Sequence, residues 1–291
     1  MDPWGRTTVA ALVEEGERVL EGAGIPAARL EAEVLLARRL GVERSGLLAR
    51  WTDPVPPAAG DGFRGDLHRR ASRYPIQYIT GMQEFHSLEF EVDERVLIPR
   101  HETEMLVDAV LERAPREGPV TIVDVGTGSG NIAVTLAMRL PGALVFACDL
   151  SPAALDVARR NAERHGVADR VRCLAGDGLQ PALAEGLGGR ADFVVSNPPY
   201  IAEHELDGVQ PELSHEPRMA LSPGPDGMSV TRSLIEAASA VLRPGGWLFV
   251  ELSIGCADRA LRLLGTALWE SVLVAPDIQG IPRVLGARRR A

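Results

Sequence analysis

An α/β fold is predicted for this 291-residue chain, with a doubly wound, mainly parallel sheet that follows a small N-terminal helical bundle. Two observations predict it. First, apolar residues in the stretch 7–75 recur at helical spacing. Second, from Pro119 onward short apolar runs alternate with helical patterns, which is typical of βαβ units and a parallel sheet.

Residues 1–75 are expected to form the helical bundle. Residues 7–50 are predicted to contain two helices, the second opened by Pro26, because proline is favoured in the first turn of a helix. Residues 51–61 are rich in proline and alanine and are predicted to be a connection, and residues 63–73 a third helix. The bundle carries no catalytic constellation, so two roles stay open for it: a stabilising cap, or a docking surface for a macromolecular substrate.

Residues 76–100 are expected to link the bundle to the main domain, residues 101–291. The weak alternation over residues 84–92 indicates a hairpin. A short apolar run then ends before Arg100, which could line the cleft or lie as a solvated arginine between domains. The acidic residues that follow suit the first turn of a helix, because of the helix dipole.

The main domain is predicted to hold seven strands separated by helices. The strands are expected at 120–125, 143–148, 171–174, 191–195, 247–252, 269–273 and 284–286, and the main helices at 132–140, 153–165 and 230–242. Because consecutive parallel strands need a helical crossover, this order predicts an open sheet that binds its ligands at the carboxyl ends of the strands.

The composition excludes several kinds of chemistry. All 31 basic residues are arginine, so neither a lysine Schiff base nor a lysine-containing phosphate-binding loop is possible. The formal net charge of −9 opposes binding to a nucleic-acid backbone. We find no apolar run of transmembrane length and no signal-peptide pattern at the first residues, so a cytoplasmic protein without membrane contact is expected.

No metal site is predicted. The three cysteines lie far apart and form no CxxC pair, which suits a reducing compartment and argues against structural zinc. The histidines are scattered, and packing in the core or at the surface is the preferred interpretation for each. They are His68, His86, His101, His165, His204 and His215.

A glycine-rich turn follows the first strand of the main domain. It has the pattern D-x-G-x-G-x-G, and its candidate binding residues are Asp124, Gly126, Thr127, Gly128, Ser129 and Gly130. Glycines let the backbone turn tightly and approach a ligand closely. A dinucleotide fingerprint would need glycine at position 131, where the chain has asparagine. The turn therefore predicts a cofactor with an amino-acid portion and a nucleoside but no pyrophosphate.

Two further acids end the next two strands. Asp149 can accept hydrogen bonds from both ribose hydroxyls of a nucleoside. Its alternative is an N-cap role, but Ser151 and Pro152 already supply the cap and the first helical residue. Asp177, which precedes Gly178, could accept from an adenine amino group, and a polar turn is its alternative.

A rigid corner, residues 196–201, follows the fourth strand. Its two consecutive prolines fix φ, remove two N–H donors and push Asn197 toward an extended conformation. The Asn197 side-chain carbonyl and the Pro198 backbone carbonyl could each accept one N–H of a planar NH₂ group, while Tyr200 stacks on its plane. Pro199 keeps the corner stiff. An ordinary proline-rich turn is the alternative.

These pieces resemble the class I S-adenosylmethionine-dependent methyltransferases, and the Asn-Pro-Pro-Tyr corner narrows the resemblance to enzymes that methylate planar nitrogens. Segments 77–81, 97–104, 215–221 and 280–284 match those typical of the HemK/PrmC family, the peptide chain release factor glutamine methyltransferases. The resemblance covers about residues 10–288, and it implies a seven-stranded class I methyltransferase sheet.

The resemblance also implies an activity. S-adenosylmethionine would be the cofactor, with S-adenosylhomocysteine as product and no metal. The acceptor would be the side-chain amide nitrogen, N5, of the glutamine in the Gly-Gly-Gln motif of bacterial release factors, bound by an expected monomer. Asn197, Pro198 and Tyr200 would be catalytic. Pro199 and Arg100 would help to bind the substrate, and Asn197 would also contact the cofactor.

Three alternatives remain open: a ribosomal protein glutamine methyltransferase, a nucleic-acid adenine-N6 methyltransferase, and a non-catalytic binding protein of the same fold. Three places depart from the family pattern. One is the segment Pro99-Arg100-His101-Glu102-Thr103-Glu104, where the family commonly has Pro-Arg-Pro-Asp-Thr-Glu. Gly178 stands where the family has a bulky residue, which predicts looser adenine packing. The turn after Glu251 lacks the Gly and Gln of the family's E-x-G-x-x-Q, which leaves its role open.

Overall fold

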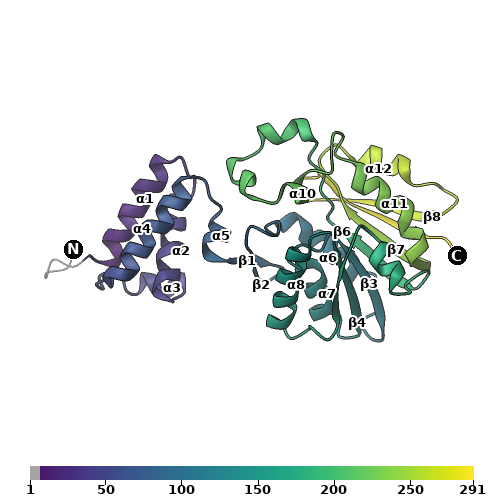
Figure 1. Ribbon diagram of the computed structural model, residues 1–291, viewed down its shortest axis with the longest axis horizontal. Helices are drawn as coiled ribbons and strands as arrows, with labels where there is room; N and C mark the ends of the chain where they lie inside the picture. Colours follow the sequence, from purple (N-terminus) through teal and green to yellow (C-terminus); the bar gives the residue numbers. More distant parts are fainter. Residues whose placement is uncertain (1–6) are drawn as a thin grey trace. The chain divides into compact units, whose positions relative to one another are not determined.

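The computed structural model describes residues 7–291, which form two compact units. One unit contains the described residues up to Gly81 together with Pro211–His215, and the other contains Met82–Gln210 and Glu216–Ala291. Figure 1 shows the helices of the first unit and the sheet of the second. The sequence predicts a bundle over residues 1–75, a linker over 76–100 and a main domain over 101–291. Because those bounds are assigned partly by function, this division stays a prediction.

The first unit is built from helices around one core. They are α1 Val9–Gly22, α2 Ala28–Leu40, α3 Arg44–Leu48, α4 Pro57–Ala71 and α5 Ile76–Thr80, with the short η3 Pro211–His215. The core takes residues from α1, α2 and α4, among them the fully buried Leu12, Leu36 and Phe63. Gly16 allows this packing, because a Cβ there would lie 2.8 Å from the side chain of Phe63.

The connection predicted for residues 51–61 is wrong in its second half, because α4 already begins at Pro57. Pro56 precedes the helix in an extended conformation, with φ −56° and ψ 137°. Pro57 occupies the first turn, where a missing N–H costs no hydrogen bond, and two alanines with high helix propensity follow. The proline-rich sequence therefore starts a helix here.

Residues 211–215 belong to the helical unit because two of its arginines hold Glu212. The Glu212 carboxylate accepts from Arg70 at 3.0 Å and from Arg73 at 3.3 Å. Burial opposes the charged form, but these arginines keep the pKa of Glu212 below its usual value. His215 packs edge-on against the ring of Tyr74. The chain therefore crosses from the second unit into the first after Gln210 and returns at Glu216.

The second unit contains a seven-stranded sheet with the order β5-β4-β3-β6-β7-β9-β8. The strands are β3 Val120–Val125, β4 Ala143–Asp149, β5 Val171–Ala175, β6 Ala191–Ser196, β7 Leu242–Glu251, β8 Trp269–Pro276 and β9 Pro282–Arg289. Pairs among the first five strands in this order are parallel, and β9 runs antiparallel to β7 and β8. This confirms the predicted doubly wound, mainly parallel sheet.

Helices cover both faces of the sheet (Figure 1). On the face of Ile122 they are α6 Glu104–Leu111, α7 Asn131–Arg139 and α8 Pro152–Arg164, and on the face of Val123 they are α9 Gln180–Ala184, α11 Ser229–Val241 and α12 Ala257–Leu263. The central strands are mainly apolar because both of their faces are buried. The shorter elements are η1 His101–Thr103, η2 Glu203–Gly208 and α10 Arg218–Leu221. No helix within residues 7–291 is both long and apolar enough to span a membrane.

The predicted hairpin is confirmed as β1 Met82–Phe85 paired antiparallel with β2 Leu88–Glu91. Its two turn residues, His86 and Ser87, both have positive φ angles, of 52° and 63°. Two-residue hairpin loops favour this backbone because its twist matches that of the strands. The hairpin packs into the sheet's core through Phe85 and Phe90.

Candidate active site

The strand register brings four functional positions into one row at the carboxyl edge of the sheet. The last aligned residues of the four strands are Cys148 of β4, Val125 of β3, Ser196 of β6 and Val250 of β7. The next residues along these strands are therefore Asp149, Gly126, Asn197 and Glu251. The row crosses the point where β3 has β4 on one side and β6 on the other, which is where open α/β sheets bind ligands.

A pocket at this edge collects part of the predicted site. Its lining includes the predicted residues Gly126, Gly128, Asp149, Asp177, Gly178, Asn197 and Pro199. The other predicted residues do not line it: Asp124, Thr127, Ser129, Gly130, Pro198, Tyr200 and Arg100. The lining also includes Leu97, Met219 and Ala220, which come from segments that the sequence singled out only by resemblance. Sequence reasoning missed Leu150, although an apolar residue beside a ribose-binding acid was a usable signal.

Each glycine of the D-x-G-x-G-x-G turn adopts a backbone conformation that favours glycine. Gly126, Gly128 and Gly130 have φ angles of 74°, 55° and 79°. A Cβ on Gly130 would lie 3.1 Å from the Cβ of Ala158, so this glycine also lets α7 approach α8. All three positions thus favour glycine because of their backbone conformation, and Gly130 is also required by helix packing.

Asp124 and Thr127 support this turn from the protein interior. The Thr127 hydroxyl donates to Asp124 Oδ2 at 2.6 Å. Asp124 is fully buried, and burial raises the pKa of its carboxyl to about 7, although the Thr127 hydrogen bond acts in the opposite direction. Ser129 is buried as well, and its hydroxyl donates to Asn131. These side chains order the turn, and the pocket is lined by its glycines.

Asp149 links the glycine turn to the start of α8. Its Oδ2 accepts from the backbone N–H of Gly128 at 2.9 Å, and its Oδ1 accepts from that of Ser151 at 2.8 Å. The N-cap hydrogen bond of α8 is made by the Ser151 side chain to the N–H of Ala154, as the sequence predicted. Burial raises the pKa of Asp149, and the backbone donors oppose that rise. Each carboxylate oxygen retains acceptor capacity toward the pocket.

Leu150 and Asp177 line the same pocket beyond Asp149. Leu150 is 58% exposed, so part of its apolar side chain is open to the pocket. Asp177 accepts the N–H of Gln180 through its backbone carbonyl at 3.1 Å, so this residue also forms part of a turn. Gly178 presents no side chain beside it, which keeps this end of the pocket open. Both interpretations of Asp177 are therefore compatible with the geometry.

The corner after β6 is fixed from two sides. The Ser196 hydroxyl donates to the carbonyl oxygen of Val125, which joins the ends of β6 and β3. The backbone N–H groups of Tyr200 and Ile201 both donate to the carbonyl oxygen of Leu221, at 3.2 and 3.0 Å. These contacts hold the residues between them, including Asn197, in one conformation at the edge of the sheet.

The phenol of Tyr200 does not line the pocket and lies near the buried carboxyl of Glu251. Burial, reinforced by the nearby Glu251, raises the pKa of its phenol to about 12. The phenol is therefore neutral at physiological pH and is not a general base in this state. A Cβ on Gly227 would lie 2.6 Å from the Tyr200 carbonyl oxygen, so glycine at 227 is needed for the chain to pass behind the corner.

Two buried polar residues, Thr103 and Glu251, contact this site without having been assigned to it from the sequence. Asn197 Nδ2 donates to Thr103 Oγ1 at 2.9 Å. Burial raises the pKa of Glu251 to about 7, and a hydrogen bond from Thr103 partly offsets the rise. In the sequence, Thr103 was singled out only as part of a segment that resembles the family, and Glu251 only as the acid of the altered E-x-G-x-x-Q turn, so neither was assigned to the site.

Arg100 forms an ion pair with the buried Glu216. Its guanidinium contacts Glu216 Oε1 at 2.5 Å, and Glu216 Oε2 accepts from the N–H of Ile98 at 3.1 Å. Glu216 is almost fully buried, whereas Arg100 is partly exposed. The pair ties the segment before η1 to the segment before α10. A role for Arg100 in substrate binding stays a prediction.

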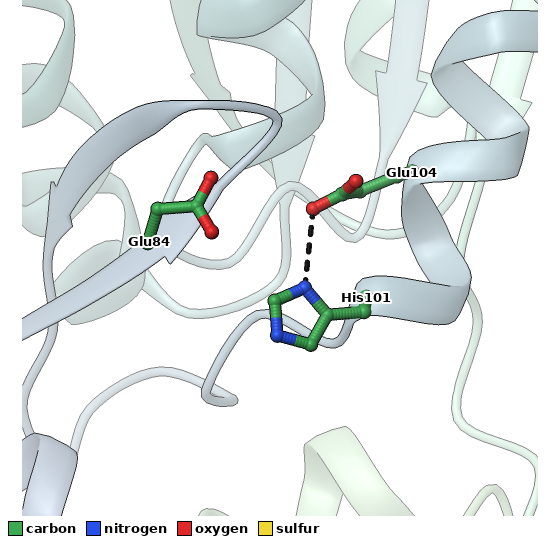
Figure 2. Close-up of side chains that lie close together, drawn as sticks. All are labelled: Glu84, His101 and Glu104. Carbon is green, nitrogen blue, oxygen red and sulfur yellow. Dashed lines mark hydrogen bonds and ion pairs between the residues drawn. The ribbon is translucent and has the colours of Figure 1, made fainter.

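Among residues 7–291, one group of side chains is close enough to share a metal ion: Glu84, His101 and Glu104 (Figure 2). His101 Nδ1 lies 3.3 Å from Glu104 Oε1. The carboxylates also have partners of their own: Glu104 accepts from the N–H of His86 at 3.0 Å, and Glu84 from that of Ser87 at 2.5 Å. Because these bonds hold the hairpin turn, the cluster has a structural explanation, and the prediction of no metal stays a prediction.

Comparison with known proteins identifies two families along the chain. Residues 11–81 match the PrmC N-terminal domain, and residues 101–227 match the methyltransferase small domain. A release factor glutamine methyltransferase of Moorella thermoacetica is 46% identical over 286 residues, which cover 97% of this chain and 99% of that protein. One of Geobacter sulfurreducens is 44% identical over 282 residues, covering 97% and 96%.

A solved structure gives the same fold. The hMettl16 catalytic domain, in complex with MAT2A 3'UTR hairpin 6, aligns with a TM-score of 0.53 over 75% of this chain and 80% of that chain. The two sequences are 17% identical, so this likeness concerns the fold alone.

Proposed function

The chain belongs to the release factor glutamine methyltransferase family, and on that premise we propose that it transfers a methyl group from S-adenosylmethionine to N5 of the glutamine in the Gly-Gly-Gln motif of peptide chain release factors. The observation that carries the proposal is that Asn197 and the glycine turn line one pocket. The partner would be a release factor in the cytoplasm, bound by a monomer of this protein.

The residues of the pocket fit S-adenosylmethionine. The backbone at Gly126 and Gly128 is free of side chains, which suits the amino-acid portion of the cofactor. The remaining acceptor capacity of Asp149 suits the two ribose hydroxyls. The exposed side chain of Leu150 suits an adenine face, and Asp177 suits the adenine amino group. When bound, the cofactor supplies an electrophilic methyl group on a positively charged sulfur.

Asn197 and Pro198 would act on the substrate amide. An amide nitrogen is a poor nucleophile because its lone pair is delocalised into the carbonyl, so positioning must supply much of the rate enhancement. The Asn197 Oδ1 and the Pro198 carbonyl oxygen would each accept one N–H of the amide. These two acceptors fix its rotation and stabilise the positive charge that develops on nitrogen as the carbon–nitrogen bond forms.

The neutral ring of Tyr200 would stack on the amide plane, and Pro199 would keep the corner rigid. The proton that the nitrogen loses can pass to solvent after the methyl group has moved, because the methylated nitrogen is then strongly acidic. No residue therefore has to remove the proton beforehand. Arg100 would help to hold the segments that border the substrate, through its pair with Glu216.

The experiment that tests the function offers the protein several acceptors with a labelled methyl donor. The panel contains a release factor, the same factor with its Gly-Gly-Gln glutamine changed to alanine, a ribosomal protein, and DNA. We expect label only in the intact release factor, on the glutamine side chain, as identified by mass spectrometry of the labelled peptide. Label on the ribosomal protein or on adenine instead would overturn the proposal.

Replacing Asn197 tests its assigned role. Asn197→Ala removes one acceptor for the substrate amide and is expected to lower kcat by at least about 100-fold. The affinity for S-adenosylmethionine, measured by calorimetry, should stay within severalfold, because the glycine turn and Asp149 are unchanged. A rate near that of the wild type would contradict the assignment.

A further inference from the structure

A chain of hydrogen bonds leads from the pocket into the protein interior through Asn197, Thr103 and Glu251. Asn197 Nδ2 donates to Thr103 Oγ1 at 2.9 Å. Thr103 in turn lies beside Glu251, where its side chain lowers the pKa of that buried carboxyl against the effect of burial. Thr103 and Glu251 are each 2% exposed, whereas Asn197 lines the pocket. The three residues come from η1, the corner after β6 and the end of β7, so only the fold brings them together.

Resting on the function proposed above, we propose that Thr103 and Glu251 are positioning residues that set the amide orientation of Asn197, so that its Oδ1 faces the substrate. The Thr103 hydroxyl has a single proton to donate. An ionised carboxylate only accepts hydrogen bonds, so the Thr103 proton points to Glu251. Thr103 can then only accept from Asn197, which turns the NH₂ of Asn197 inward and its Oδ1 the other way.

This orientation matters because the two ends of the Asn197 amide act oppositely on a substrate NH₂. Oδ1 accepts from an N–H of the substrate, whereas a flipped Asn197 would present its own NH₂ to that group and repel it. The buried Glu251 carboxylate also polarises the hydrogen bond between Thr103 and Asn197, which makes Asn197 Oδ1 a stronger acceptor. Both effects favour the positive charge that develops on the substrate nitrogen.

The register of the sheet supplies independent support. Glu251 is the residue after Val250 on β7, and Asn197 is the residue after Ser196 on β6, and these two strand residues are aligned. In the described part of the chain, Glu251 Oε2 is buried without a hydrogen-bond partner. A buried, unpartnered carboxylate oxygen is costly, so its presence beside the catalytic corner calls for a functional reason.

Protonation of Glu251 weakens this arrangement, because a carboxylic acid can donate as well as accept. Burial and the neighbouring Glu102 raise the pKa of Glu251 to about 7, while Thr103, Arg283 and Arg100 oppose the rise. The phenol of Tyr200 also faces it and stays neutral. The ionised, ordering form of Glu251 therefore becomes more populated as pH rises through about 7.

The first test removes the Thr103 hydroxyl, which lies between Asn197 and Glu251. Thr103→Val keeps the shape and removes the hydroxyl, and it is expected to lower kcat on the order of 10- to 100-fold with little change in S-adenosylmethionine affinity. Thr103→Ser should restore most of the rate. Thr135→Val is the matched control, because the Thr135 hydroxyl is buried without a partner on α7, and it should keep the wild-type rate. Equal rates in Thr103→Val and Thr135→Val would overturn the proposal.

The second test follows pH. In the wild type kcat should rise through about pH 7 and then level off, and Glu251→Gln should be slower and lose that rise. The chain has only three asparagines, so selective labelling of asparagine resolves the Asn197 side-chain amide by NMR. Its resonances should titrate near pH 7 in the wild type and not in Glu251→Gln. An Asn197 signal that titrates identically in both proteins would overturn the proposal.

These measurements separate two kinds of failure. If the wild type labels no release factor, the proposed function fails, and the NMR titration still decides whether Glu251 controls Asn197. If the wild type is active and both the Thr103→Val rate and the Glu251→Gln pH profile match the wild type, the proposed function stands and the positioning role is wrong.

Discussion

At the scale of single residues, the acids at this sheet edge differ in what surrounds them. Asp124 lies fully buried beneath the glycine turn, Asp149 is half-buried with two backbone donors, and Asp177 is exposed in the pocket lining. Glu251 is buried with one oxygen unpartnered. Position at a strand end is common to all four, and the roles diverge because burial and donors decide which acid can meet a ligand.

Asp149→Ala is expected to weaken S-adenosylmethionine binding on the order of 10- to 100-fold, because it removes the charged acceptor proposed for the ribose hydroxyls. Isothermal titration calorimetry measures the change. Asp156→Ala is the control: Asp156 is an exposed residue of α8 whose carboxylate forms a surface ion pair with Arg159, and its loss should leave affinity unchanged. Unchanged affinity in Asp149→Ala would count against the ribose role.

At the scale of elements, the site is built where strands end and helices begin. The glycine turn joins β3 to α7, Asp149 joins β4 to α8, and the proline-rich corner leaves β6. Each junction contains residues that can be recognised in the sequence: glycines that adopt positive φ, a serine that caps a helix, or two consecutive prolines. Gly130 has a second function, because it lies against Ala158 where α7 meets α8.

Replacing Gly130 with alanine tests this packing role. The positive φ alone is expected to cost about 1–2 kcal/mol of unfolding free energy. The contact with Ala158 should add about 1–3 kcal/mol. Gly166→Ala is the matched control, since Gly166 has φ 67° and nothing within 4 Å of its ideal Cβ. Urea unfolding measures both variants, and equal losses would show that the approach of α7 to α8 does not depend on Gly130.

At the scale of the whole molecule, the helical unit takes its residues from two separate stretches of the chain. Pro211–His215 lies between the proline-rich corner and α11 in the sequence, yet it is part of the helical unit. The ion pairs of Glu212 with Arg70 and Arg73 stabilise this assignment. Pro211 follows the corner, residues 196–201, by ten positions, so the corner is connected along the chain to this part of the helical unit.

Two buried carboxyls give the molecule a defined pH dependence of stability. Burial raises the pKa of Asp124 from 3.8 and that of Glu251 from 4.5, both to about 7. Between those values the folded state binds more protons than the unfolded state, so stability falls as pH rises from about 5 to about 8. The loss should be on the order of 2 kcal/mol for each carboxyl.

Differential scanning calorimetry across this range measures the effect, and Glu251→Gln should flatten the slope without abolishing it, because Asp124 remains. Tm values that rise from pH 5 to pH 8 would contradict the assignment of raised pKa values to these two groups.

The sequence by itself determined the strand–helix order, the glycine turn, the proline-rich corner and the acids that follow the strands. These features depend on local backbone geometry and on hydrophobic period, which neighbouring residues express directly. Only the tertiary structure decided that Thr103 and Glu251 lie near Asn197 and that Pro211–His215 joins the helical unit. Such contacts join residues up to 148 positions apart through strand register and burial, and no local pattern encodes them.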